Sequence, residues 1–164
     1  YMLGVSLYSD LRSFIPNYNN IILTGSAIRL TNLSPGTNYY YKLRTINEYG
    51  YGEDSKIFNI LTTPEKPVVL APLNVTSTSF VARWNSVQGA KHYKLDVSTN
   101  SNFVSYLPGY ENRTIMATSQ SVTGIPNGTT SYYRVRAENR SGASINSDIM
   151  SSIPIPAPVA IAAT

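Results

Sequence analysis

The chain has 164 residues, of which 13% are charged, and its net charge is +4. It contains no cysteine, which excludes a disulfide framework. No apolar stretch approaches the roughly 20 residues that a membrane-spanning helix needs, and the basic residues are scattered singly, whereas nucleic-acid binding requires them to cluster. We therefore expect neither nucleic-acid binding nor membrane insertion of this segment.

The sequence repeats itself at a distance of 92 residues without a gap. Identical residues coincide along the whole overlay, among them Pro16 with Pro108, Arg44 with Arg136, and Gly50 with Gly142. A period of about 90 residues suits one small β domain and is too long for a solenoid unit. A chain of repeated modules usually works by arraying them, so we expect a display or spacer protein and not an enzyme.

In chain order, the repeat divides the sequence into three parts. Residues 1–64 overlay only the later two thirds of the complete repeat, so we expect a partial module that lacks its first two strands. Residues 65–156 form a complete module. Residues 157–164 match the opening of that module with a one-residue slip, and we expect the start of a third module or a linker. The chain is thus interpreted as an excerpt of a longer array.

A module without its first two strands leaves the inner face of its remaining sheet uncovered. We expect this face to carry Leu3, Val5, Tyr41 and Leu43. An exposed apolar face of this kind favours strand pairing or swapping. We therefore predict that residues 1–64 are ordered only with a longer parent chain, a partner strand or a swapped neighbour. If they form a well-packed monomer, another segment, such as the 157–164 tail, must fill this face.

Alternating apolar and polar residues predict the strands of the complete repeat. Phe80, Ala82 and Trp84 share one face, and the odd-numbered residues at 93–97 and 133–137 are predicted to face inward. The predicted strands are 77–84, 92–98, 103–110, 119–122, 132–139 and 147–153. Short strands separated by turns predict an all-β, immunoglobulin-like seven-stranded β-sandwich.

Proline recurs at the two predicted module boundaries. Residues 62–67 contain two prolines and residues 153–158 contain three. Proline at close intervals favours extended polyproline geometry, which acts as a semi-rigid spacer. We expect limited flexing between neighbouring modules.

These residues resemble fibronectin type III modules over essentially the whole chain. The family carries a tryptophan late in its second strand, which Trp84 matches. Its run of spaced residues around the sixth strand is matched in the first copy by Leu33, Pro35, Thr37, Tyr39, Leu43, Thr45, Asn47 and Gly50, and is echoed in the second. The texture, rich in Asn, Ser, Thr and Tyr, is similar to tandem repeats of exported bacterial proteins.

The resemblance implies a tyrosine corner, in which a tyrosine hydroxyl bonds to upstream backbone. Tyr39 stands at that position in the first copy, whereas the second copy has Ser131 there. Alternation turns Tyr132 toward the opposite face. We therefore predict a tyrosine corner in the first copy and none in the second.

The sequence offers little for catalysis, for a metal or for a cofactor. A serine triad needs a base that a third group holds, and the single histidine, His92, has only strand neighbours. Glu53 and Asp54 supply too few oxygens for calcium and are expected to be loop charges. Three basic residues, Lys94, Arg134 and Arg136, are interleaved with Asp96 and Glu138, so we expect cross-strand pairing on a solvated face.

Four tyrosines are the candidate ligand contacts. Tyr49 and Tyr51 follow the long strand of the first copy, and Tyr106 and Tyr110 flank a turn in the second. Exposed aromatic rings stack on sugar faces and dominate contact energetics. The alternative is that these rings cover sandwich edges or a module junction.

We therefore expect a non-catalytic spacer, presentation or adhesion module of an extracellular or cell-surface protein, secreted by a bacterium. Its partners would be neighbouring modules of the same chain, and a polysaccharide or a surface protein. Two alternatives stay open: a carbohydrate-binding module that uses the loop tyrosines, and a receptor-type protein-binding ectodomain. The absence of cysteine and the single tryptophan weigh against the second.

Overall fold

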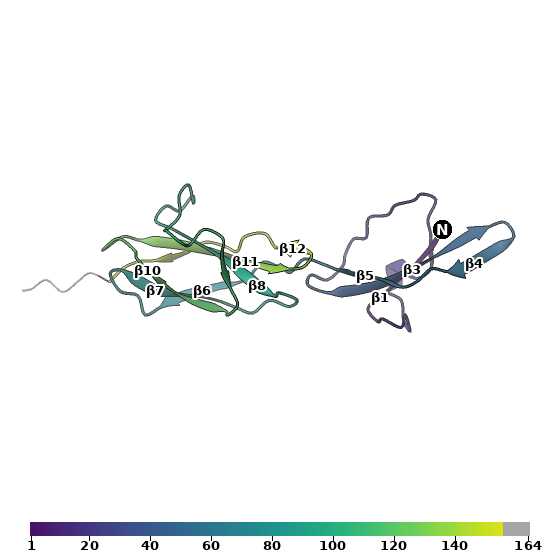
Figure 1. Ribbon diagram of the computed structural model, residues 1–164, viewed down its shortest axis with the longest axis horizontal. Helices are drawn as coiled ribbons and strands as arrows, with labels where there is room; N and C mark the ends of the chain where they lie inside the picture. The colour runs from purple at the N-terminus through teal and green to yellow at the C-terminus, as the bar shows by residue number, and fades with distance from the viewer. Residues whose placement is uncertain (156–164) are drawn as a thin grey trace, which may run out of the picture. The chain divides into compact units, whose positions relative to one another are not determined.

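The computed structural model describes residues 1–155, which form two compact units that divide between Thr62 and Thr63. Apart from the 3-10 turn η1 (Pro16–Tyr18), the regular structure of these residues is β-strand, and all strand pairs are antiparallel (Figure 1). The predicted all-β class is therefore confirmed. The predicted start of a third module, residues 157–164, lies outside the described residues.

The second unit is a sandwich of two sheets. One sheet has three strands in the order β10 (Ser119–Thr123), β7 (Ser79–Trp84) and β6 (Val69–Leu73). The other has the order β12 (Gly142–Ala143), β11 (Ser131–Asn139), β8 (His92–Ser98) and β9 (Arg113–Ile115), and β13 (Met150–Ser152) also pairs with β11. These two antiparallel sheets form an immunoglobulin-like β-sandwich.

The core of the second unit lies between the inward faces of β7, β8 and β11, as the alternation predicts. Phe80 on β7 is 1% exposed, and its ring lies 5.5 Å from the ring of the fully buried Tyr133 on β11. Trp84 on β7 meets Tyr93 on β8 edge-on, also at 5.5 Å between ring centroids. These two aromatic pairs join the sheets.

The predicted edge strand at 103–110 is wrong, because this segment forms a loop and the edge strand is β9. Phe103 and Gly109 have positive φ angles of 54° and 81°, which break an extended path. The loop forms two hydrogen bonds with Val97 of β8. Leu107 N–H donates to the Val97 carbonyl, and Val97 N–H donates to the Tyr110 carbonyl. The side chains at 103–110 therefore follow no alternation.

The first unit contains one sheet with the strand order β2 (Ile21–Ile22), β1 (Met2–Ser6), β3 (Asn38–Asn47) and β4 (Gly50–Asp54), with β5 (Phe58–Leu61) also paired to β3. The same order occurs in the second unit, where β9, β8, β11 and β12 take the places of β2, β1, β3 and β4, and β13 takes the place of β5. The register agrees as well: Leu3 faces Leu43 as Leu95 faces Val135, a shift of 92 residues at both positions.

The first unit has no second sheet among its described residues. Residues 27–31, which correspond to β10 in the repeat, form no strand. In the second unit the first two strands, β6 and β7, precede the repeated sheet, and residues 1–62 contain no equivalent of them.

A tyrosine corner is present in the first unit and not in the second, as predicted. The hydroxyl of Tyr39 accepts a hydrogen bond of 2.8 Å from the N–H of Ser34. In the second unit Ser131 is buried at the same position, and no hydrogen-bond partner for its hydroxyl lies among the described residues. The hydrogen bond that closes this turn in the first unit therefore has no equivalent at Ser131.

Replacing Tyr39 with phenylalanine is expected to destabilise the first unit by about 1 kcal/mol, the net value of one hydrogen bond. The ring stays buried, at 4% exposure, so packing is retained and only the bond to Ser34 is lost. Amide hydrogen exchange of β1 and β3, measured residue by residue, isolates the first unit. Tyr40→Phe is the control, and an equal loss there would contradict the assignment.

Candidate functional site

Two of the predicted contact tyrosines lie on the hairpin between β3 and β4. Tyr49 is 89% exposed and Tyr51 is 63% exposed. They line a shallow depression of about 320 Å³ together with Thr45, Ile46, Asn47, Gly50 and Gly52. Arg44 lies over the Tyr51 ring at 5.8 Å from its centroid. The hairpin therefore offers two accessible aromatic rings.

The other two predicted tyrosines are not an exposed pair. Tyr110 is only 5% exposed and belongs to the core of the second unit. Its hydroxyl accepts a hydrogen bond from Thr123 N–H at 3.2 Å and donates to Ser121 O at 3.3 Å. Tyr106 is half-buried, with its ring against Phe103. Because Tyr110 is buried, it is not available as a ligand contact. Its hydroxyl instead ties the 103–110 loop to β10.

The charged stripe on the outer face of β8 and β11 is internally paired, as predicted. Arg134 Nε lies 3.0 Å and Arg136 Nη2 3.5 Å from Asp96 Oδ2, and Lys94 Nζ lies 3.7 Å from Glu138 Oε2. The prediction that this face is solvated is wrong at Asp96, whose side chain is 2% exposed. The stripe therefore offers no free cluster of positive charge.

The alternation placed Asp96 on the outer face correctly but did not show what covers it. Asn112 N–H donates a 2.8 Å hydrogen bond to Asp96 Oδ1, so the loop before β9 closes over the carboxylate. The Arg134 guanidinium lies over the Phe103 ring of the same loop, 4.2 Å from its centroid. The sequence did contain one indication of this buried ion pair, because two arginines, Arg134 and Arg136, lie on the strand next to a single acid, Asp96.

Asp54 is an ion-pair partner in a strand and not a free loop charge. Lys42 Nζ lies 2.5 Å from one of its oxygens and Arg44 Nε lies 2.7 Å from the other. The hydrogen bonds from Arg44 and then Lys42 lower the pKa of Asp54 to about 2. No cluster of three metal-ligating side chains occurs within residues 1–155.

Acidification is expected to remove a contribution of Asp54 to the stability of the first unit. Because its folded pKa of about 2 lies below its ordinary 3.8, this contribution is present in full above the ordinary value and is lost as the pH falls toward 2. Urea unfolding of the wild type and of Asp54→Asn between pH 6 and pH 2 tests this. The difference between them should shrink on acidification; a constant difference would contradict the assignment.

His92, like Asp54, pairs with a side chain of a neighbouring strand. Its Nε2 lies 2.8 Å from Glu138 Oε2 across β8 and β11, and no nucleophile is bonded to it among the described residues. Residues 1–155 also contain no helix with the length and apolar character needed to cross a membrane. The described residues therefore show no catalytic constellation built on the histidine.

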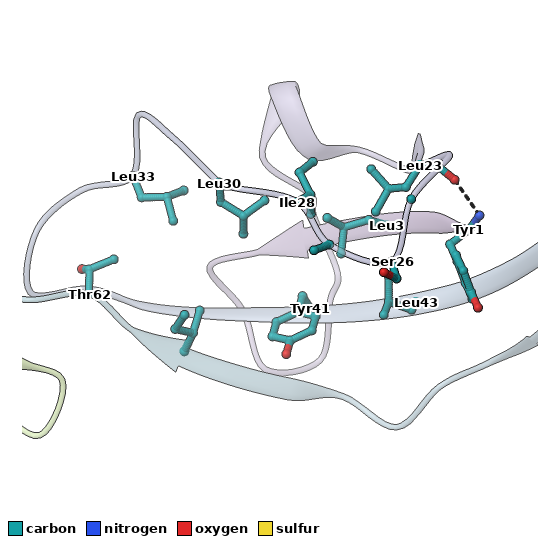
Figure 2. A pocket seen from close by; sticks show the side chains of 13 residues that line it. Tyr1, Leu3, Leu23, Ser26, Ile28, Leu30, Leu33, Tyr41, Leu43 and Thr62 are labelled. Atoms are coloured by element: carbon teal, nitrogen blue, oxygen red, sulfur yellow. Dashed lines mark hydrogen bonds between the residues drawn. The ribbon is translucent and has the colours of Figure 1, made fainter.

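A pocket of about 680 Å³ lies over the inner face of the first sheet. Figure 2 shows Leu30 and Leu33 of the 23–33 loop on one side and Tyr41 of β3 on the other. None of its lining residues has a charged side chain: Tyr1, Leu3, Leu23, Gly25, Ser26, Ala27, Ile28, Leu30, Leu33, Tyr41, Leu43, Ile60 and Thr62.

The predicted exposure of that inner face is wrong for two of its residues. Leu3 is 3% exposed and Val5 is fully buried, because Tyr18, Tyr39 and the loop leucines pack against them. Tyr41 and Leu43 are only half-buried and line the pocket. The loop thus covers one end of the face and leaves the other open.

No protein-family model and no curated protein matches the chain. Among solved structures, an Fn3-like protein from Clostridium thermocellum is 26% identical, with a TM-score of 0.47 over 58% of this chain and 98% of that one. A structure named FN3tt is 21% identical, with a TM-score of 0.44 over 56% of this chain and 94% of that one. A β-1,2-glucanase from Parabacteroides distasonis is 16% identical, with a TM-score of 0.48 over 65% of this chain and 16% of that one.

Proposed function

We propose that this chain is a non-catalytic spacer or presentation module of a multidomain extracellular or cell-surface protein, with neighbouring modules of the same chain as its partners. The observation that supports this proposal is the repetition of one sheet in both units, strand for strand and in the same register. Repetition of a rigid unit adds length and supplies no reactive group, which is what a spacer requires.

The composition supports an exported location. Only 13% of the residues are charged, so hydroxyl and amide side chains keep the chain solvated. The resemblance to tandem repeats of exported bacterial proteins points the same way. A spacer that carries an adhesive or catalytic domain away from a cell surface uses this composition without needing a ligand of its own.

The spacer role requires a stiff junction between the two units, and this can be measured. The chain has no native cysteine, so spin labels at Glu48→Cys and Ser101→Cys, one exposed site on each unit, report a single distance. We expect a narrow distance distribution that Pro64→Gly broadens, since Pro64 is buried at the start of the junction. A broad distribution in the unchanged chain would count against a spacer.

Carbohydrate binding is a second candidate, favoured by the exposure of Tyr49 and Tyr51, 89% and 63%. The full chain would be titrated against a panel of polysaccharides by calorimetry, with Tyr49→Ala and Tyr51→Ala as the test variants. Tyr8→Ala is the control, because Tyr8 is 40% exposed and lies outside the hairpin. Binding that both test variants abolish and the control retains would support this role. The absence of binding heat with every polysaccharide would contradict it.

A further inference from the structure

The edge strands of the second unit differ in how they resist pairing with another chain. Edge strands normally avoid such pairing through proline, an irregular register, charged side chains or shortness. β6 contains Pro72 and a register shift between Leu70 and Leu73. β9 is three residues long and includes Arg113, while β12 and β13 have two and three residues. Each of these strands therefore carries at least one of the usual protections.

β10 carries none of them. It has five residues without proline or charge, and it pairs with β7 alone and without a register shift. Its outer edge is covered instead by a tyrosine that follows the Pro108-Gly109 turn. The Tyr110 hydroxyl donates a hydrogen bond of 3.3 Å to the carbonyl of Ser121 and accepts one of 3.2 Å from the N–H of Thr123.

These two backbone groups lie on the open side of β10. Trp84 N–H donates to the carbonyl of Thr118 just before β10, and the backbone groups of an antiparallel strand alternate between its two sides. The even-numbered residues of β10 therefore direct their N–H and C=O groups toward β7, whereas Ser121 and Thr123 direct theirs outward. An added strand would use these outward groups, and Tyr110 occupies two of them.

The same contact recurs in the first unit at the 92-residue shift. The hydroxyl of Tyr18, the counterpart of Tyr110, accepts a hydrogen bond of 2.7 Å from Thr31 N–H and donates one of 3.3 Å to Thr31 O. Thr31 is the counterpart of Thr123. Tyr18 is 8% exposed and Tyr110 is 5% exposed, so both rings belong to a core and both hydroxyls reach the same backbone position. The contact is therefore a property of the repeated module.

We propose that the outer edge of β10 is a self-association surface, that its partner is a second copy of this chain, and that Tyr110 keeps it closed. Without Tyr110, two copies would pair their β10 strands antiparallel about a two-fold axis at Ser121. The strand Ser-Gln-Ser-Val-Thr contains no charge, so this pairing meets no repulsion between like charges. A charged edge would exclude a second copy by itself, whereas this neutral edge depends on the tyrosine.

Tyr110→Leu opens the edge, because leucine fills part of the buried space but does not reach Ser121 or Thr123. We expect sedimentation of the full chain to show a concentration-dependent dimer in this variant and a monomer in the unaltered chain. Adding Ser121→Lys to Tyr110→Leu should restore the monomer, since the two-fold axis brings the two lysines face to face. Ser121 is exposed, so the fold accommodates the lysine.

Tyr93→Leu is the matched control for the loss of a buried tyrosine ring. Tyr93 is 6% exposed in the same core, and its hydroxyl accepts a hydrogen bond of 3.0 Å from Val87 N–H, which is not part of β10. This variant should lose stability and stay monomeric. The dispersion of the amide signals of ¹⁵N-labelled chain shows whether each variant is folded.

Tyr110→Phe is the more conservative change, because it keeps the ring and removes only the hydroxyl. Thr123 N–H then loses its partner, and its exchange with solvent should become about fivefold faster, the effect of one hydrogen bond. The carbonyl of Ser121 retains a bond of 2.7 Å from Gln120 Nε2, so the Thr123 amide is the sharper readout. The amide of Leu95 on β8 should exchange at an unchanged rate.

Three results would overturn the proposal. One is a Tyr110→Leu chain that is folded and monomeric at every concentration. Another is a dimer that Ser121→Lys leaves intact or that Tyr93→Leu also forms, which would assign the association to another surface or to a general loss of stability. The last is an unchanged exchange rate of the Thr123 amide in Tyr110→Phe, and this measurement decides the question if the leucine variant does not fold.

Discussion

Replacing Phe80 with alanine lowers the free energy of unfolding of the second unit by about 3–5 kcal/mol, as large-to-small changes of buried aromatic residues do. Phe80 is 1% exposed, and its ring is the contact through which β7 packs on Tyr133 of β11. The change removes that contact and leaves a cavity between two sheets that are otherwise rigid. A loss of this size is a large part of the stability of a small domain.

The measurement is urea unfolding followed by tryptophan fluorescence. Trp84 is the single tryptophan and is 2% exposed in the core of the second unit, so its emission reports that unit. Val104→Ala, at a residue that is 77% exposed, should change stability by no more than about 0.5 kcal/mol. A loss below about 1 kcal/mol for Phe80→Ala would mean that β7 is not packed on β11 as described.

The alternation of residues was sufficient to predict the faces of β7, β8 and β11, because successive side chains of a strand point to opposite sides. Leu95, Val97 and Val135 are all fully buried, as their positions predicted. The tyrosine corner at Tyr39 was predictable for a different reason, because the resemblance to fibronectin type III modules implies it at that position.

Residues outside strands were not predictable in this way. Tyr110 follows the Pro108-Gly109 turn, and only its hydrogen bonds to β10 decide that its ring is buried. Those partners, Ser121 and Thr123, lie 11 and 13 residues further along the sequence. No local pattern encodes such a contact, so an exposed tyrosine and a buried one have the same sequence signature.

The first unit shows the same limit on a larger scale. The repeat indicated that its first two strands are missing, and the structure contains none in residues 1–62. The repeat did not indicate that the loop before β3 folds back over Leu3 and Val5, because the equivalent residues of the second unit, 119–123, form strand β10 and pair with β7.

Replacing Asp96 with alanine is expected to destabilise the second unit by about 3 kcal/mol, the lower end of the cost of removing one partner from a buried ion pair. Asp96 is 2% exposed, and its loss leaves Arg134 and Arg136 without their shared acceptor and Asn112 N–H without its own. The arginine side chains are 22% and 26% exposed, so water recovers part of their charge and the cost stays at that lower end.

The matched control for this change is Asp148→Ala. Asp148 lies 2.9 Å from Lys66, but its side chain is 86% exposed, so its removal should cost less than about 1 kcal/mol. Both variants are measured by the Trp84 fluorescence of urea-unfolded samples, at low and at high salt. Salt should weaken the small Asp148 contribution and leave most of the Asp96 contribution, because the 112 loop shields the buried carboxylate. Equal small losses at both positions would show that solvent reaches Asp96, and the outer face of β8 and β11 would then be the solvated surface that the alternation predicted.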